Sequence, residues 1–594
     1  MTLRVKSVIY VFMEKTFRLL VFSLIMVFLA ACSGPKTVRL AESGPVTPKP
    51  VGAQPSDRSA PSNPKAYYYF ILSQLQLREG KLEEGTRSLQ EAIKYDPKEP
   101  SLHVQLARLY VFTGSLNESV EECKLALAHD PHFLSAYLLL GGIYTSLKKP
   151  KFAIESYQKA IEMDPTNRES YLYLSSLYSD TKEYDKAIQA LESFLKIEPN
   201  SSMGLYSLGR IYAEKKSYQK ASEYFLKSLA LEPNEITVLM DLGIIYEILN
   251  EPEKAIEFYK RILSLDPDNK KARNRLGQVF IKEKKLDEAL NQFREIQRSD
   301  SADLNIHMRM GLIYLEQGKL DQAILEFNFV LAANPKDDRV RYYLGAAYVE
   351  KEALDQAILE FKRIPPDSAL FADSRRSITL ILKKQNKVED AVRIMEDAIQ
   401  AKPKDPDLYL ILAALYEKEN QSEKALAVIQ RGLQQNREDI DLQFQLGAIY
   451  DKLGNFEKAV AQMKEVLRLK PDSADALNYL GYSYAEKGIY LQEALGMIQK
   501  AMALKPNTGY ITDSLGWVYY QLGEYEKAVA ELEKASRLTP DDSTIAEHLA
   551  DGYYKLNQIP KALSFYEKAL TLEPKPDQAE RLKGKIKEIK EKKK

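Results

Sequence analysis

The chain has 594 residues, of which 84 are Lys or Arg and 84 are Asp or Glu, so its formal net charge is zero. This balance argues against a nucleic-acid-binding protein, which carries a strongly basic surface. Hydrophobic residues at 45% and charged residues at 28% exclude both a wholly disordered chain and a protein with many membrane spans, and two cysteines exclude a disulfide-built scaffold.

Residues 1–31 have the features of an export signal. Four basic residues come first, and residues 19–29 are apolar apart from one serine. A run of about 11 residues is too short to span a bilayer and has the size of the apolar segment of a signal peptide. Either Met1 or Met13 can be the first residue of this signal.

The apolar run ends in Leu-Ala-Ala-Cys, which places Cys32 directly after two small residues. This ending resembles the lipobox of bacterial lipoproteins, and the resemblance implies that Cys32 is the lipidated first residue of the mature protein. The alternative is an ordinary signal peptide with an incidental cysteine. Ser33 follows, where enteric bacteria use Asp as a retention signal, so the resemblance implies a location in the cell envelope, at the outer membrane and facing the periplasm.

Residues 32–65 are expected to form a disordered tether that begins with the lipidated cysteine. They contain seven prolines, three glycines and five serines, but few large apolar residues. Such a composition cannot bury a core and favours an extended chain. The tether would hold the folded part of the protein away from the membrane.

Twelve prolines after residue 64 follow a fixed register. They recur at intervals of 34 or 68 residues, with one interval of 35, at positions 97, 131, 165, 199, 233, 267, 335, 403, 471, 506, 540 and 574. A period of 34 residues is typical of tetratricopeptide repeats, each a helix–turn–helix unit. The chain resembles the tetratricopeptide-repeat (TPR) family over residues 66–577. This resemblance implies an all-α solenoid, a right-handed superhelix of about fifteen units.

Positions within each unit are counted from 31 residues before its proline. Position 8 is small, position 11 is usually Tyr, position 20 is usually Ala and position 24 is large and apolar, as in Gly243, Tyr246, Ala255 and Tyr259. Small residues let the two helices of a unit approach, and large residues fill the space between units. In six units a glycine at position 15 is expected to end the first helix in a left-handed conformation. Most tyrosines are thereby explained by packing.

Two irregularities break the register. Ile364-Pro365-Pro366 is expected to end the second helix of the ninth unit early. The resulting kink or seam would separate units 1–9 (residues 66–365) from units 10–15 (residues 366–576). The interval of 35 residues places an extra residue near 489–492, where it should bulge the turn between two helices.

The last unit needs a cap on its open apolar side. Residues 577–594 are expected to supply a capping helix and a basic tail. Ala579, Leu582, Ile586 and Ile589 are spaced by three or four residues, which places them on one helix face. Residues 590–594 are expected to be solvated, and the alternative is contact with anionic lipid or polysaccharide.

No motif indicates an enzyme. The chain has no Gly-x-x-x-x-Gly-Lys phosphate loop, no His-Glu-x-x-His and no Gly-x-Ser-x-Gly. Cys123 lies near His129 and His132, but it occupies position 24, so we expect a buried packing thiol rather than a metal ligand. The repeats also leave no room for a catalytic domain. We therefore expect no catalytic residue, metal, cofactor, small-molecule substrate or nucleic-acid partner.

Binding is expected on the concave groove that the first helices form in this family. The TPR groove is lined by positions 2, 5, 9 and 12, and carrying these positions over defines two candidate patches. The first patch comprises Leu138, Leu172, Tyr206, Arg210, Met240 and Ile244. The second patch comprises Asn478, Tyr482, Tyr510, Asp513, Trp517 and Tyr520. Trp and Tyr are common in binding hot spots, and the alternative is that Trp517 packs between helices.

One branch of the family binds chaperone tails by clamping a C-terminal carboxylate with Lys and Asn at positions 5 and 9. In this chain Asn274 and Asn478 occupy position 5, but Gln278 and Tyr482 occupy position 9 beside them. The clamp is not reproduced, so chaperone-tail binding is not expected.

The sequence therefore predicts a non-enzymatic scaffold or adaptor, anchored to the envelope membrane by its lipid, that binds peptides or protein partners in the TPR groove. Repeat lipoproteins that it resembles assist type IV pilus secretin assembly, outer-membrane protein insertion or recruitment of cell-wall hydrolases. The sequence does not choose among these complexes. The alternative is an accessory factor of exopolysaccharide export or cell-wall assembly that contacts a synthase or a glycan.

Overall fold

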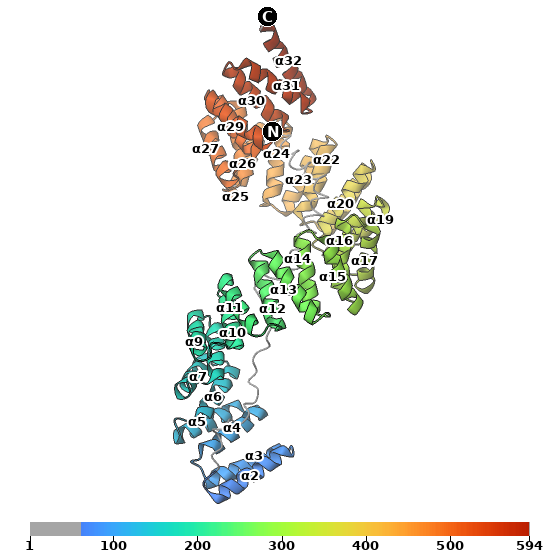
Figure 1. Ribbon diagram of the computed structural model, residues 1–594. Coiled ribbons are helices and arrows are strands. Elements are labelled where there is room, and N and C mark those ends of the chain that lie inside the picture. The colour runs from blue at the N-terminus through green and yellow to red at the C-terminus, as the bar shows by residue number, and fades with distance from the viewer. Residues whose placement is uncertain (1–60, 593–594) are drawn as a thin grey trace. The chain divides into compact units, whose positions relative to one another are not determined.

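The computed structural model describes residues 61–592 of the chain. Every regular element in this part is an α-helix, from α2 to α32, and this part contains no strand (Figure 1). None of its helices combines the length and the apolar character needed to cross a bilayer. The predicted signal, the lipid attachment at Cys32 and nearly all of the tether lie outside the described residues.

First and second helices of a unit alternate along the described chain. The first helices are α2 (Pro64–Arg78), α4 (Pro100–Thr113), α6 (Leu134–Ser146), α8 (Arg168–Asp180), α10 (Ser202–Glu214), α12 (Ile236–Ile248), α14 (Lys270–Lys282), α16 (Leu304–Glu316), α18 (Asp338–Glu350), α20 (Phe371–Lys384), α22 (Pro406–Lys418), α24 (Ile440–Lys452), α26 (Ala474–Lys487), α28 (Gly509–Gln521) and α30 (Ser543–Lys555). The second helices are α3 (Leu82–Tyr95), α5 (Leu116–His129), α7 (Pro150–Met163), α9 (Tyr184–Ile197), α11 (Tyr218–Leu231), α13 (Pro252–Leu265), α15 (Leu286–Ser299), α17 (Leu320–Ala333), α19 (Leu354–Lys362), α21 (Val388–Ala401), α23 (Ser422–Gln435), α25 (Phe456–Leu469), α27 (Leu491–Leu504), α29 (Tyr525–Leu538) and α31 (Ile559–Thr571). The helix α32 (Pro576–Lys592) follows the last pair. The predicted all-α fold of fifteen helix–turn–helix units is confirmed.

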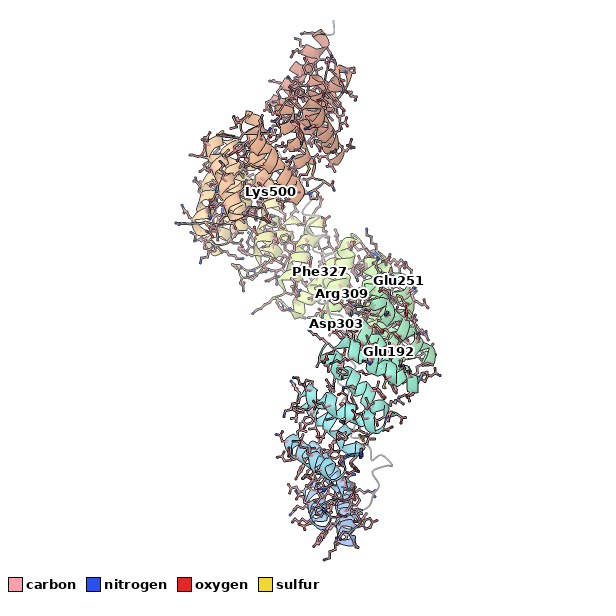
Figure 2. All side chains as sticks on the ribbon, turned by 90° about the vertical axis from the view of Figure 1, so that its left-hand side faces the viewer. Glu192, Glu251, Asp303, Arg309, Phe327 and Lys500 are labelled. Carbon is pink, nitrogen blue, oxygen red and sulfur yellow. The ribbon has the colours of Figure 1, made fainter. Side chains whose placement is uncertain are left out.

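The described residues form two compact units, which are considered separately. One comprises residues 61–306 and the other residues 307–592, so the boundary falls within α16. Within each of these two compact parts, the most extensive helix contacts join the two helices of one repeat, as in α10 with α11 and α28 with α29. Large apolar side chains such as Phe327 are buried, whereas charged ones such as Glu192 and Lys500 are exposed (Figure 2).

The small residue at position 8 lies directly against the large residue at position 24. A Cβ atom placed on Gly243 would be 2.4 Å from Cε1 of the buried Tyr259. The same close approach joins Gly141 to Tyr157, Gly209 to Phe225, Gly277 to Phe293, Gly311 to Phe327, Gly345 to Phe361, Gly447 to Met463, Gly481 to Ile498 and Gly516 to Leu532. The repeated pairing explains why the two helices of a unit lie so close together.

The first helices are followed by a residue with a left-handed backbone conformation. Glycine takes this place in six repeats, as predicted, at Gly80, Gly114, Gly318, Gly454, Gly488 and Gly523. In other repeats a polar residue adopts it, such as Lys148 with a φ of 54° and Asn250 with a φ of 59°. After Asn250 the amide of Glu251 donates to the carbonyl of Tyr246 at 2.9 Å, which satisfies a carbonyl at the helix end.

The helix α19 has nine residues, whereas α17 has 14, so it ends early before the two consecutive prolines, as expected. Arg375 of α20 satisfies the carbonyls exposed at this end. Its Nη1 donates to the carbonyl of Phe361 at 2.8 Å, and its Nη2 donates to that of Ile364 at 3.1 Å. Burial lowers the pKa of Arg375 to about 10.

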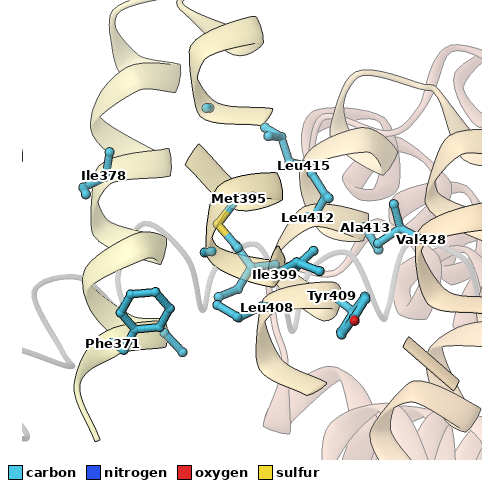
Figure 3. Close-up of a cluster of buried hydrophobic side chains, with 14 of the residues drawn as sticks. Phe371, Ile378, Met395, Ile399, Leu408, Tyr409, Leu412, Ala413, Leu415 and Val428 are labelled. Atoms are coloured by element: carbon cyan, nitrogen blue, oxygen red, sulfur yellow. The ribbon is translucent and has the colours of Figure 1, made fainter. Parts of the chain in front are cut away.

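The apolar core continues past the prolines. One cluster runs from Tyr342 of α18 to Ile449 of α24. Its middle part includes Phe371 and Ile378 of α20 and Met395 of α21 (Figure 3). The division of the chain into units 1–9 and 10–15 stays a prediction.

The extra residue of the thirteenth unit lies in the turn between α26 and α27. Two residues of this turn have left-handed conformations, Gly488 with a φ of 69° and Tyr490 with a φ of 49°. At the end of the chain α32 covers α31, where Leu582, Ile586 and Ile589 pack in one cluster with Tyr566. Both local features agree with the sequence pattern.

Candidate partner-binding surfaces

A cavity of about 830 Å³ opens between α2, α4 and α6, all within residues 61–306. Its wall is mostly apolar, and Arg108 is the one charged residue in the lining. Side chains from all three helices contribute, among them Leu77, Arg108, Val111, Phe112, Leu138 and Leu139. Concave sites of this size, with an apolar wall and few polar groups, are typical of ligand-binding sites.

The cavity follows from the register of three consecutive first helices. Gln74, Arg108 and Gly142 all occupy position 9, on the groove face, and all three line the cavity. Phe112 occupies position 13, and 78% of its surface is exposed. Val111 beside it is 38% exposed. Large apolar side chains that stay exposed around a hollow mark an interaction surface.

Of the six lining residues named from the three helices, sequence reasoning found only Leu138. The two candidate patches omitted α2 and α4, and position 13 was not among the positions considered. A signal was present, because the next three first helices carry Ser146, Asp180 and Glu214 at position 13, whereas α4 carries Phe112. Among the described first helices only α12 also has an apolar residue there, Ile248, and a large apolar side chain at a mostly polar position indicates a contact surface.

The residues of the first patch do not form one exposed surface. Its buried members are Leu138, Met240 and Ile244, and its partly exposed members are Leu172, Tyr206 and Arg210. Tyr206 donates a hydrogen bond to Oδ2 of Asp241 at 2.9 Å, and burial, together with the charge of Asp241, raises the pKa of Tyr206. Arg210 lies 4.0 Å from Glu214 of its own helix. Only Leu138 belongs to the cavity lining, and binding by the other members stays a prediction.

Most of the second patch forms one aromatic cluster. The ring of Trp517 stacks on those of Tyr520 and His548, with centroid distances of 4.7 and 4.1 Å. Nδ1 of His548 lies 2.9 Å from Oδ1 of the fully buried Asp513, and the ring of Tyr482 is 6.3 Å from that of His548. Nε1 of Trp517 is buried and has no hydrogen-bond partner within residues 61–592. Trp517 thus packs against its own chain, yet part of its surface stays exposed.

The remaining members of the second patch, Tyr510 and Asn478, lie outside this aromatic cluster. Tyr510 donates to Oδ1 of Asp475 at 2.6 Å, and Asn478 is buried. Sequence reasoning missed His548, because it occupies position 6 rather than one of the groove positions. Burial raises the pKa of Tyr520 to about 12, and the charge of Asp551 adds to this shift.

In the last repeat, basic side chains of α32 bind the acidic residues that stand at the groove positions. Glu547, at position 5, accepts two hydrogen bonds of 2.9 Å from Arg581 and one of 3.1 Å from Lys585. Asp551, at position 9, accepts one of 2.6 Å from Lys585. Burial acts to raise the pKa of Glu547, but the hydrogen bonds and charges of Arg581 and Lys585 outweigh burial and lower it to about 2. The chain itself neutralises these carboxylates.

Models of one repeat family match most of this region. Those described as "Tetratricopeptide repeat" match residues 66–99, 135–167, 156–189, 202–235, 248–311, 308–370 and 382–446. One described as "TPR repeat" matches residues 452–488 and 516–551. The chain belongs to the tetratricopeptide-repeat family.

Several solved structures are similar to this TPR protein. The APC/C hetero-tetramer Cut9–Hcn1 is 17% identical, with 77% of this chain and 96% of that chain covered and a TM-score of 0.35. YrrB, a TPR protein described as having an unusual peptide-binding site, is 24% identical, with 34% and 100% covered and a TM-score of 0.29. The pilF protein of Pseudomonas aeruginosa is 22% identical, with 36% and 97% covered and a TM-score of 0.29. No curated protein sequence matches the chain significantly.

The thiol of Cys123 has a packing role in this TPR protein. It is fully buried in a cluster with Ala107, Val120, Leu140 and Ile143. Burial raises the pKa of the thiol, which keeps it protonated and unreactive. Within the described part of the chain, no group of three or more His, Cys, Asp or Glu side chains is placed to hold a metal ion.

Proposed function

We propose that this TPR protein is a non-enzymatic scaffold that binds protein partners through its first helices, with the cavity between α2, α4 and α6 as the principal docking site. The cavity carries this proposal, because it combines a volume of about 830 Å³, an apolar wall and one cation, Arg108. Its occupant is a peptide segment with bulky apolar side chains and a carboxylate that pairs with Arg108. Each buried apolar side chain contributes about 1.5–3 kcal/mol, and the ion pair adds geometric specificity.

The exposed rim favours a polypeptide over a small molecule. Phe112 leaves 78% of its surface exposed, so a small ligand inside the cavity would leave most of this ring in water. A chain segment that crosses the rim would cover both Phe112 and Val111. Aromatic side chains that become buried at the centre of an interface are the usual hot spots of binding.

We further propose that the scaffold is lipid-anchored through Cys32 to the outer membrane and faces the periplasm, where it serves the assembly of an envelope, secretion or pilus complex. The support is in the sequence: an apolar run that ends in Leu-Ala-Ala-Cys, followed by a Pro-rich tether. Labelling with a fatty-acid probe that disappears in Cys32→Ala tests the anchor separately from the docking site.

Photo-crosslinking in intact cells tests the docking site. A photo-reactive residue replaces Phe112 in one variant and Leu325, a 69% exposed residue of α17, in the control. We expect the Phe112 probe to capture defined peptides that carry bulky apolar residues beside an acidic residue or a chain terminus. Adding Arg108→Glu should lower this yield about tenfold, because the carboxylate then meets a like charge.

Two outcomes would contradict the docking site. The first is an equal pattern of captured peptides from the Phe112 and Leu325 probes. The second is a yield that Arg108→Glu leaves unchanged while circular dichroism shows intact helical content.

A further inference from the structure

The outer face of α2 carries an apolar stripe. Tyr68, Ile71 and Leu75 are spaced by three and four residues, and 62%, 39% and 51% of their surfaces are exposed. Tyr67, adjacent in sequence, is 46% exposed. The terminal repeat of a solenoid normally presents a polar outer face to water. An exposed apolar face at this end therefore indicates a contact that the rest of the described chain does not make.

The same register positions are buried in later repeats. Tyr68 and Leu75 occupy positions 3 and 10, and the equivalent residues of α6 are Ala136 and Ile143, which are buried. Both of these residues pack in clusters with residues of the preceding second helix, α5. Within residues 61–592 no second helix precedes α2, so its stripe lacks the cover that α5 gives to α6.

The charges around the stripe indicate an anionic occupant. Lys65 precedes Tyr68 by three residues, Arg78 follows Leu75 by three, both are exposed, and α2 contains no acidic residue. A second copy packed antiparallel on the stripe would bring Lys65 of one chain against Arg78 of the other at both ends. A parallel copy would pair each cation with itself. Like charges at these distances oppose self-association.

The place of α2 in the chain indicates the same occupant. It is the first described element after the predicted tether and begins about thirty residues after Cys32. Tyrosine is enriched at the level of lipid headgroups, and Lys and Arg extend along apolar surface while their charges reach phosphate. A helix whose apolar face has a basic residue at each of its two ends is suited to lie in the plane of an anionic membrane surface.

We propose that the outer stripe of α2 binds the surface of an anionic lipid bilayer, so that the first repeat docks on the membrane. This proposal is independent of the docking site in the cavity. The stripe occupies positions 3, 6 and 10 of α2, whereas Gln74 and Leu77, which line the cavity, occupy positions 9 and 12. Partner binding and membrane contact would therefore use different faces of one helix.

Vesicle flotation tests this contact without the lipid anchor. The chain from Ser33 to Lys594, which keeps every described residue, is mixed with phosphatidylcholine vesicles that contain about 30% phosphatidylglycerol or none. We expect binding to the anionic vesicles that weakens as salt is raised. The triple variant Tyr68→Glu, Ile71→Glu, Leu75→Glu should lower the bound fraction about tenfold, because three charges would then have to enter the interface.

Leu325→Glu provides a control, because it places one such carboxylate on an exposed apolar site of α17. It should bind as the wild type does. The variant Lys65→Glu, Arg78→Glu changes only exposed side chains and should also lose binding to anionic vesicles, which keeps the test valid if the triple variant misfolds.

Three results would overturn the proposal. One is the absence of wild-type binding, and another is binding that the α2 variants leave unchanged, as contact through the basic end of the chain would give. The third is a wild-type dimer in light scattering that the triple variant converts to a monomer, because a second copy would then be the occupant. Phe112 and Arg108 are intact in all these variants, so failure here leaves the crosslinking test of the docking site unaffected.

Discussion

At the scale of single residues, the pairing of positions 8 and 24 sets how closely two helices approach. Gly243 has no side chain, and the ring of Tyr259 fills the space that one would occupy. Tyr259 cannot move away, because it is fully buried and its hydroxyl donates to Glu247 at 2.5 Å. A methyl group at position 8 therefore has to displace either the ring or the backbone.

Gly243→Ala should destabilise its repeat by about 1–3 kcal/mol, the usual cost of overpacking a core. Gly496→Ala is the control, because Gly496 lies in α27 and its Cβ would meet nothing within 4 Å. There the gain in helix propensity should stabilise the helix by about 0.5–1 kcal/mol. Native-state hydrogen exchange of α12–α13 and of α27 measures the two effects, and changes of the same sign would contradict the packing argument.

The same scale shows how far the sequence predicts the candidate site. Repetition makes the packing residues visible, because position 8 is small and position 24 is large in repeat after repeat. A docking surface consists of departures from the repeat, and these are single residues without a pattern. Phe112 and His548 were missed for this reason, and Trp517 was ambiguous because only the fold places it against Tyr520 and His548.

At the scale of elements, a polar side chain at position 4 of several first helices forms a hydrogen bond to the turn before it. His103 places Nε2 2.9 Å from the carbonyl of Pro97 and Nδ1 2.7 Å from the carboxylate of Glu122 in the second helix. Tyrosine or arginine bonds to the carbonyl of the preceding register proline in the same way at Tyr171, Arg273, Arg341 and Tyr409. The turn and both helices of a repeat are thereby joined by one polar side chain.

His103 should make the stability of the second repeat depend on pH. Burial acts to lower the pKa of His103, but the hydrogen bonds to Glu122 and Pro97 outweigh it, so the pKa is raised. Both ring nitrogens face acceptors, which favours the doubly protonated ring. The contribution is therefore complete below about pH 6.5, the ordinary value for the unfolded chain, and is lost as the pH rises through the higher folded value.

Hydrogen exchange of α4 and α5 in the wild type and in His103→Gln measures this dependence. The stability advantage of the wild type should shrink as the pH rises from about 6 to about 9. His132→Gln, at an exposed histidine, serves as the control and should show no such trend. An advantage that stays constant over this range would contradict the argument.

The helices themselves were largely predictable from the sequence, whereas the hydrogen bonding of the side chain at position 4 was not. A proline period and small residues recur along the helix pairs, and glycine caps mark six of them, because backbone geometry requires these residue types. Position 4 is His, Tyr or Arg in these repeats but apolar in others, as at Leu205 and Leu239, so only the observed hydrogen bonds identify its role. Left-handed caps were likewise predicted at glycines, whereas Lys148 and Asn250 adopt the same conformation without that signal.

At the scale of the molecule, stability is shared between neighbouring repeats. Extensive helix contacts join elements that are adjacent or next-adjacent in the chain, so each repeat depends on the repeats beside it. The last repeat depends on α32 in two ways. Leu582 and Ile586 cover the apolar side of Tyr566, and Arg581 and Lys585 neutralise the buried Glu547.

Truncation after Lys575 should therefore loosen only the end of the array. It uncovers the cluster around Tyr566 and removes Leu582, Ile586 and Ile589, and burial of each such side chain contributes about 1.5–3 kcal/mol. Hydrogen exchange in α30 and α31 should accelerate at least tenfold, while residues 61–306 should exchange as in the intact chain, because opening free energies are local in such arrays. Truncation after Glu591 retains these contacts and should change neither region. If residues 61–306 accelerated together with α30 and α31, the protein would unfold as one cooperative body, and the nearest-neighbour description would be wrong.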